Sequence, residues 1–179
     1  MPVRQSLRRL PSGQGDNGEP RPGRGSSGSQ LQSEMSANVP THHYQGSCHC
    51  GAIRAVLETA KAADELEVRA CQCAFCRRHG SMTVSDPAGR ARFDIEPDHL
   101  VEYQFATRTG TSLICGRCGM YAGVVLRDAG KAWSILNVRG LAIAAFSGRQ
   151  ATPMVYEGET PAARIARRKA KWTPTDIDF

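Results

Sequence analysis

Three cysteine-bearing stretches decide the fold: Cys48-His49-Cys50-Gly51, Cys71-Gln72-Cys73-Ala74-Phe75-Cys76 and Cys115-Gly116-Arg117-Cys118-Gly119. They hold all seven cysteines of the 179-residue chain, at C-x-C, C-x-C-x-x-C and C-x-x-C spacing. Knuckles this short aim two thiolates at one point, and a structural zinc ion takes four such ligands in a tetrahedron. Glycines after the cysteines permit tight turns whose backbone N–H groups can face the sulfur atoms. The spacing therefore favours metal binding.

Disulfide and redox chemistry fit this pattern poorly. The number of cysteines is odd, pairing at C-x-C spacing would close a strained ring, and no apolar segment of an export signal follows the arginines near the chain start. A thioredoxin-like C-x-x-C requires a βαβ setting, which this chain does not provide. We therefore expect a reducing, cytoplasmic setting, and a thiol-redox or zinc-storage role is disfavoured.

Seven thiolates divide most naturally into a closed set of four and an open set of three. The outer knuckles would form a structural four-thiolate zinc site, with the ligands Cys48, Cys50, Cys115 and Cys118. The central group, Cys71, Cys73 and Cys76, would hold a second zinc ion with an open fourth position, as zinc enzymes do. The alternative is a second structural site, completed by His79 three residues after Cys76. Spacing alone does not decide between these two interpretations.

The rest of the chain predicts an all-β domain. Apolar and polar residues alternate in several short segments, which we expect to be strands: residues 53–58, 66–71, 81–85, 101–105, 111–115, 121–126 and 132–138. Turn signals such as Asp128-Ala129-Gly130 separate them. Tyr103 and Trp133 are expected in the core.

Three regions are expected along the chain. Residues 1–40 contain six glycines, five prolines and seven serines, and such a segment cannot bury enough apolar surface to offset its ordering entropy. We expect a disordered tail there, with Met35 as an alternative start of translation. Residues 41–158 are the expected zinc-binding β domain. Residues 159–179 are expected to be a basic C-terminal helix and tail, with Thr160 as N-cap and Pro161 in the first turn.

The charge pattern argues against two functional classes. The formal net charge is +6, but residues 41–159 hold 13 basic and 12 acidic residues, so the excess lies at the two ends. A nucleic-acid module usually concentrates that excess on its folded face. Arg164, Arg168 and Lys171 would share one face of the C-terminal helix, which is expected to be solvated. No apolar run approaches the roughly 20 residues of a membrane span.

The cysteine groups in their context resemble the glutathione-dependent formaldehyde-activating enzyme family, which also includes centromere protein V. The resemblance rests on residues 46–54, 71–78 and 115–119, and more weakly on 135–140. It implies a fold of small β-sheets around a structural zinc, of the complex β or β-tent type. It also implies that the first and third groups bind this zinc and that Cys71, Cys73 and Cys76 bind a second, more labile one.

The type activity of the family is that of a carbon–sulfur lyase, which condenses formaldehyde with glutathione to S-hydroxymethylglutathione. The resemblance thus implies a small-molecule thiol and an aldehyde as substrates. Arg77 and Arg78 are candidates for pairing with glutathione carboxylates, His79 for a proton shuttle, and Asn137 for either the pocket or a structural hydrogen bond. The alternative function is a non-catalytic zinc-binding module that acts through protein or nucleic-acid partners.

Overall fold

The computed structural model describes residues 42–178, so the expected N-terminal tail lies outside the described residues. Within them the chain forms eleven strands: β1 (His42–Ser47), β2 (Ile53–Thr59), β3 (Arg69–Cys71), β4 (Thr83–Val84), β5 (Arg90–Ile95), β6 (Leu100–Tyr103), β7 (Thr111–Cys115), β8 (Tyr121–Asp128), β9 (Lys131–Asn137), β10 (Thr152–Met154) and β11 (Thr173–Asp178). The helices are α1 (Ala74–Arg78) and α2 (Pro161–Lys171), with single 3₁₀ turns at Pro97–His99 and Ala144–Phe146. The expected all-β fold with a short C-terminal helix is confirmed.

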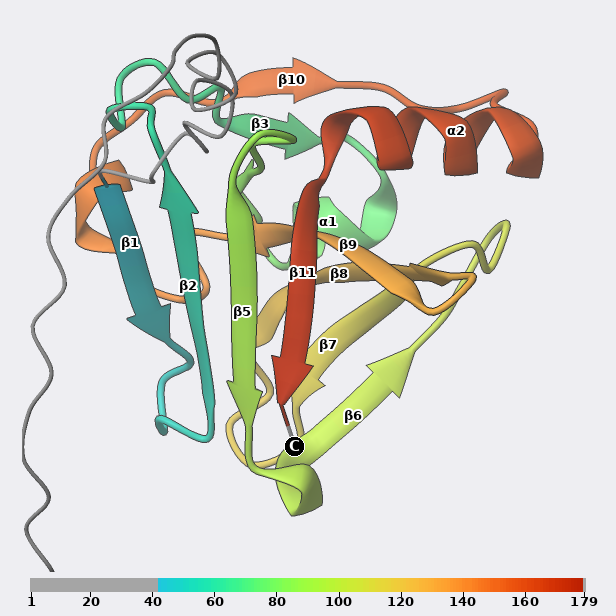
Figure 1. The fold of residues 1–179 in the computed structure, drawn as a ribbon. Coiled ribbons are helices and arrows are strands. Elements are labelled where there is room, and N and C mark those ends of the chain that lie inside the picture. Colours follow the sequence, from blue (N-terminus) through green and yellow to red (C-terminus); the bar gives the residue numbers. More distant parts are fainter. Residues whose placement is uncertain (1–41, 179) are drawn as a thin grey trace, which may run out of the picture. The chain divides into compact units, whose positions relative to one another are not determined.

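The strands form two layers that share β11 (Figure 1). One layer has the order β1-β2-β5-β11, and the other joins β6, β7, β8 and β9 and continues through β4 and β3 to β10. Thr173 and Pro174 pair antiparallel with β9, while residues 175–178 pair parallel with β5. β11 therefore links the two layers through its backbone.

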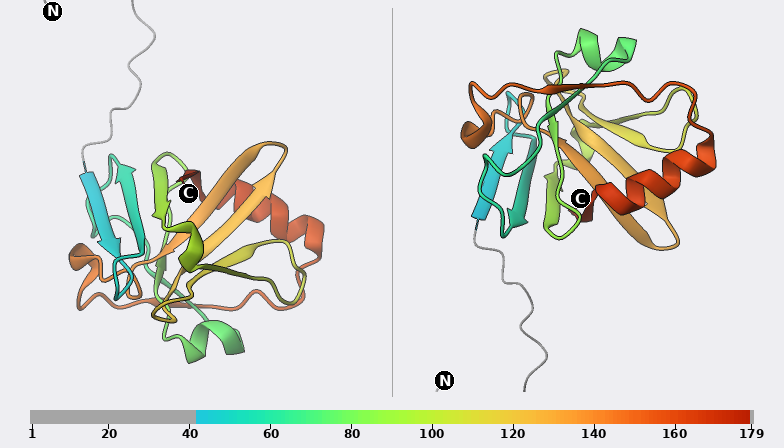
Figure 2. Two further views of the ribbon diagram at one scale, coloured as in Figure 1. Left: turned by 90° about the horizontal axis from the view of Figure 1, so that it is seen from below. Right: turned by 90° about the horizontal axis from the view of Figure 1, so that it is seen from above.

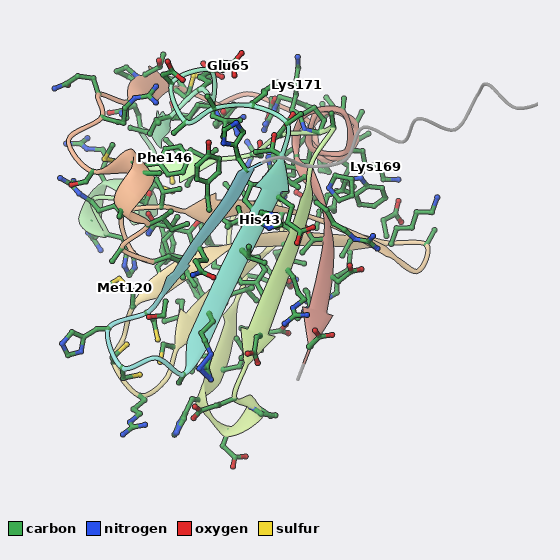
Figure 3. All side chains as sticks on the ribbon, turned by 60° about the vertical axis from the view of Figure 1, so that its left-hand side comes forward. His43, Glu65, Met120, Phe146, Lys169 and Lys171 are labelled. Atoms are coloured by element: carbon green, nitrogen blue, oxygen red, sulfur yellow. The ribbon has the colours of Figure 1, made fainter. Side chains whose placement is uncertain are left out.

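The core lies between these layers. In β2 and β5 every second side chain is buried, including Ile53, Leu57 and Phe93. A Cβ added to Gly123 of β8 would collide with the Ile135 carbonyl oxygen of β9 and lie 3.2 Å from the Phe93 ring, so this glycine allows close approach both within its layer and between the layers. At the edge of the core, Phe146 (labelled in Figure 3) packs edge-on against Tyr44 of β1, with ring centroids 5.2 Å apart.

The helix α2 begins as its sequence predicts. The Thr160 hydroxyl accepts a hydrogen bond from the backbone N–H of Ala163, and Pro161 occupies the first turn. The helix lies across β8 and β9 (Figure 2), where Lys169 pairs with Asp128. No helix within residues 42–178 is long and apolar enough to cross a membrane.

Several local expectations need correction. The strand expected at 66–71 is confined to Arg69–Cys71, although Leu66 and Val68 are buried. Tyr103 is 45% exposed instead of in the core, because β6 pairs only with β7 and turns this side outward. Trp133 is only half-buried. Strands β1, β5, β10 and β11 were not predicted, and β11 occupies the segment expected as a tail after the helix.

Candidate metal centres and active site

The outer knuckles meet at one point, as their spacing predicts. The sulfur atoms of Cys48, Cys50, Cys115 and Cys118 all lie within 4.8 Å of one another. Each knuckle is closed by a backbone hydrogen bond from a glycine: Gly51 donates to the Cys48 carbonyl at 3.0 Å, and Gly119 donates to that of Cys115 at 2.8 Å. Both glycines have positive φ, 84° and 73°, which explains why a residue without Cβ stands there.

The geometry of this four-thiolate cluster fits zinc. The Cys50 sulfur lies 3.7 Å from that of Cys48 and 3.5 Å from that of Cys115. A Zn–S bond of about 2.3 Å places the sulfur atoms of a tetrahedral site roughly 3.8 Å apart. The backbone N–H of Ile53 donates to the Cys48 sulfur at 3.3 Å, as expected around a bound thiolate. These four residues can therefore hold a zinc ion without rearrangement.

The central trio is assembled at the junction of β3 and α1. Cys71 ends β3, Cys73 is the N-cap of α1, and Cys76 lies within the helix. The backbone N–H of Cys76 donates to the Cys73 sulfur at 3.5 Å. The three sulfur atoms lie within 4.8 Å of one another, and no histidine or carboxylate of residues 42–178 joins them. The trio is thus a three-thiolate donor set with one tetrahedral position left open.

One thiol of each cluster is poised to lose its proton. A hydrogen bond from the Cys76 thiol stabilises the Cys71 thiolate and, against the effect of burial, lowers the pKa of Cys71 to about 6. The same hydrogen bond, together with burial, raises the pKa of Cys76. Burial would also raise the pKa of Cys118, but hydrogen bonds from the backbone of Met120 and Cys50 outweigh it and lower this pKa to about 6. Each cluster therefore presents a thiolate at neutral pH, which favours capture of a cation.

His79 and Asn137 do not belong to the trio. The His79 ring is exposed and lies 4.5 Å from that of Phe75, outside the sulfur cluster. The Cys₃His alternative therefore has no support in the described chain. Asn137 is buried, accepts a hydrogen bond from the Met82 backbone and donates to the Tyr121 carbonyl at 2.8 Å. Its role is structural, and it fixes the start of β8 beside the trio.

Two cavities flank the trio, and Cys71 and Cys76 line both. The first, which we call the 142–151 groove, has a volume of about 910 Å³ and includes Arg77 and Arg139. The second, which we call the α2 cavity, has a volume of about 440 Å³ and also includes Cys73. Arg77 and Arg78 are both exposed, but Arg78 lines neither cavity and instead lies in a separate hollow with Phe75 and His79. The trio can therefore be approached from two sides.

Sequence reasoning missed most of the α2 cavity. Apart from the trio, its polar lining includes Arg69, Tyr121, Tyr156, Arg164, Arg167 and Arg168. Arg164 and Arg168 were expected on a solvated face of the helix together with Lys171, yet both line this cavity, as does Arg167. Arginines that line a cavity are not displayed on an outer surface where they could contact nucleic-acid phosphates. Trp172 at the end of the helix could have indicated this orientation in the sequence. Its ring is buried against the domain, and Arg168 lies over that ring and so also faces the domain.

The tyrosine in this cavity is close to the trio. Tyr121 is completely buried, and its pKa is raised well above the usual value, first by burial and then by the negative charges of Cys76, Cys71 and Cys73. Its hydroxyl finds no hydrogen-bond partner among the described residues. It is therefore a neutral, buried hydroxyl without a partner in the wall of the cavity that the trio also lines.

Comparison with known proteins places these cysteines in a family context. The model of the family described as glutathione-dependent formaldehyde-activating enzyme matches residues 43–152. Among solved structures, the crystal structure of a Rhodobacter sphaeroides protein is similar, with 29% sequence identity and a TM-score of 0.47. That match covers 62% of this chain and 99% of the other. The matched family segment contains both cysteine clusters and ends before α2.

Proposed function

The chain belongs to the glutathione-dependent formaldehyde-activating enzyme family, and on that premise we propose that it is a zinc-dependent carbon–sulfur lyase. It would form or cleave a thiol–aldehyde adduct at Cys71, Cys73 and Cys76, with glutathione and formaldehyde as the type substrates. The observation that carries this proposal is the open trio: three converging thiolates, no fourth side-chain ligand within residues 42–178, and a cavity on either side.

The two clusters have different roles in this proposal. Cys48, Cys50, Cys115 and Cys118 form a closed set in which Cys48 and Cys115 are buried, so their zinc would hold the first knuckle to the third. Two of the trio's members, Cys71 and Cys73, are only half-buried. A zinc ion bound there would be the more labile of two per chain, because it has three protein ligands and is open to exchange.

The residues around the trio supply what an addition of thiol to aldehyde requires. A bound zinc ion favours the thiolate form of a substrate thiol or polarises an aldehyde oxygen as a Lewis acid. The 142–151 groove is large enough for a tripeptide thiol such as glutathione, and Arg77 at its rim can pair with one of its carboxylates. The Tyr121 hydroxyl can donate to an oxygen that develops negative charge.

Metal analysis and an adduct assay on the same preparation test this proposal. We expect about two zinc ions per chain, one of which a mild chelator removes. Exchange NMR of formaldehyde with glutathione should show acceleration by the protein, and Cys73→Ser should abolish it while the fold persists. Full acceleration by the Cys73→Ser protein, or a single tightly bound zinc, would rule out the trio as the active site.

A further inference from the structure

The α2 cavity contains an unusual set of unused hydrogen-bond donors. Within residues 42–178, three buried side-chain polar atoms have no hydrogen-bond partner: Arg69 Nε, Tyr121 Oη and Arg168 Nε. All three belong to residues that line this cavity. A buried donor left unpaired costs about 1–3 kcal/mol, so the wall of this cavity carries polar groups that the described residues alone do not satisfy.

Two of the arginines that line the cavity have no acidic partner of their own. Glu159 pairs with Arg164 at 3.2 Å and with Arg167 at 2.6 Å, which neutralises part of the helix row. Neither Arg69 nor Arg168 has a carboxylate within salt-bridge distance among the described residues. Burial, and then the nearby Arg164 and Arg167, lower the pKa of Arg168 to about 10, so it remains a cation at neutral pH. The acid that lines the cavity, Glu157, is exposed.

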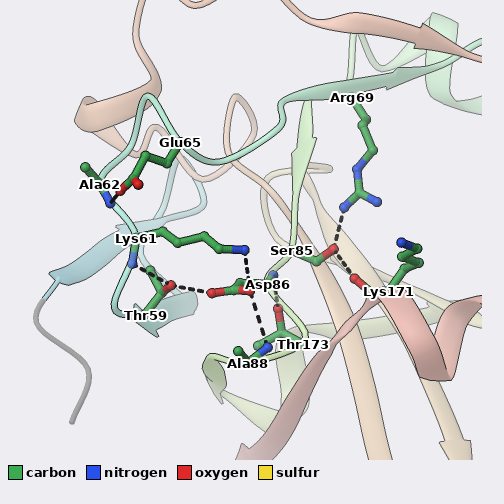
Figure 4. A network of polar contacts seen from close by, with 10 residues as sticks. All are labelled: Thr59, Lys61, Ala62, Glu65, Arg69, Ser85, Asp86, Ala88, Lys171 and Thr173. Carbon is green, nitrogen blue, oxygen red and sulfur yellow. Dashed lines mark hydrogen bonds and ion pairs between the residues drawn. The ribbon is translucent and has the colours of Figure 1, made fainter. Parts of the chain in front are cut away.

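Both free arginines are held in place by the fold. Arg168 donates to the Thr109 hydroxyl at 2.9 Å and stacks on the Trp172 ring at 4.6 Å. Arg69 donates to the Ser85 hydroxyl, which donates in turn to the Lys171 carbonyl at 2.8 Å and so ties β3 to the end of α2 (Figure 4). Prepositioned guanidinium groups bind an anion without the entropic cost of ordering long side chains.

The geometry points to the α2 cavity as a carboxylate-binding site, so that the preferred carbonyl substrate is an acidic aldehyde of the 2-oxo acid class, such as glyoxylate. This inference rests on the proposed function. Formaldehyde is neutral and small and would use neither arginine, whereas a carboxylate matches the guanidinium group in charge and in planar geometry. Of the two arginines, Arg69 lies within the family-matched segment 43–152, and Arg168 of α2 lies outside it.

The reaction that follows is a balanced addition. The carboxylate pairs with Arg168 and Arg69, and the aldehyde carbon lies toward the trio. The thiolate sulfur forms a bond to that carbon, the carbonyl π bond breaks, and its oxygen takes the proton that the thiol gave up, next to the Tyr121 hydroxyl. The product is the hemithioacetal of glyoxylate, in which the carbon bonded to sulfur carries a hydroxyl and a carboxylate, and no oxidant or reductant is consumed.

Calorimetric titration of the zinc-loaded full chain with glycolate tests the cavity without requiring turnover. Glycolate resembles hydrated glyoxylate but cannot react, and glycolamide is its neutral counterpart. We expect glycolate to bind more tightly than glycolamide, and Arg168→Gln to weaken it about tenfold or more, because a charged hydrogen bond is lost. Arg69→Gln should weaken it similarly, which provides a second variant should one of them fold poorly.

Lys169→Gln is the matched control, since it removes the same charge from the same helix. Lys169 is exposed (Figure 3), and it is not among the residues that line the cavity. It should leave glycolate affinity within about twofold, apart from long-range charge effects that salt screens. The inference is overturned if Lys169→Gln weakens binding as much as Arg168→Gln, if glycolamide binds as well as glycolate, or if inorganic phosphate binds more tightly than either.

Exchange NMR then separates this inference from the proposed function. With glutathione present, the wild-type chain should accelerate adduct formation by glyoxylate more than by formaldehyde, and Arg168→Gln should lose only the glyoxylate preference. Acceleration of formaldehyde alone refutes the acidic-aldehyde assignment and leaves the lyase function standing. No acceleration of either aldehyde, with glycolate binding still dependent on Arg168, refutes the lyase function and keeps the carboxylate site.

Discussion

Replacement of Cys115 by serine is expected to unfold the domain. Cys115 is fully buried at the end of β7, and its sulfur lies 3.5 Å from that of Cys50, so the change removes one of four converging sulfur atoms. Structural zinc contributes roughly 10–16 kcal/mol to folding in small zinc domains, while the whole free energy of unfolding of a domain is about 5–15 kcal/mol. Loss of this zinc therefore removes most or all of the stability.

The same replacement at Cys73 is expected to leave the domain folded. Cys73 is half-buried, and its sulfur caps α1 by accepting the Cys76 backbone N–H. Serine is among the best N-cap residues, so Cys73→Ser preserves the cap and removes only the thiolate. The free energy of unfolding should change by no more than about 1 kcal/mol.

Urea denaturation followed by tryptophan fluorescence, together with zinc content, measures both variants. Trp172 is buried and Trp133 half-buried, so unfolding changes the surroundings of both rings. Cys73→Ser should keep a cooperative transition and one tight zinc, and Cys115→Ser should show neither. A cooperative transition for Cys115→Ser within about 2 kcal/mol of wild type would refute the structural role of the four-thiolate cluster.

Three further variants probe the fold and the α2 cavity. The pKa of Asp86 is lowered because, although burial opposes ionisation, the Thr59 hydroxyl and the Lys61 ammonium stabilise its carboxylate (Figure 4). Asp86→Asn should lower the free energy of unfolding by about 1–3 kcal/mol at pH 7. Because a carboxyl with a depressed pKa stabilises the folded state only while it is ionised, the urea midpoints of wild type and variant should converge on acidification below about pH 4. A difference between the midpoints that stays constant with pH would contradict this. Gly110→Ala would place a Cβ 2.5 Å from the Arg168 guanidinium, the movable end of that side chain, so glycolate affinity should fall severalfold with little change in urea midpoint; unchanged affinity would show that Arg168 does not contact the ligand. Thr160→Ala removes the α2 cap and should lower the unfolding free energy by about 1 kcal/mol, and no change in the urea midpoint would mean that the cap is redundant.

The cysteine arrangement was predictable because its information is local. Spacing of two or three residues limits which thiols can converge, and the chemistry of zinc then divides seven ligands into four and three. The structure brings together the same two sets. The capped start of α2 was predictable for the same reason, since Thr160 and Pro161 act on the helix turn that follows them.

The missing parts depend on contacts distant in sequence. β11 contains Pro174 and two aspartates, which disfavour a strand, and it forms one because β5 and β9 offer it backbone partners on both sides. The inward orientation of Arg168 depends on Thr109 and on the space above Gly110, which no helical pattern reveals. The carboxylate site therefore could not be located before the fold was known.

The position of β11 has a consequence for biosynthesis. The ligands of the four-thiolate cluster all precede residue 119, so this cluster can assemble on the ribosome well before β11 has been translated. The two layers are joined between β5 and β9 only when β11 has left the exit tunnel and can pair with both strands. A nascent chain stalled before that moment could already bring its four thiols together yet leave two strand edges unpaired, a state that chaperones would recognise and that C-terminal truncation would make permanent.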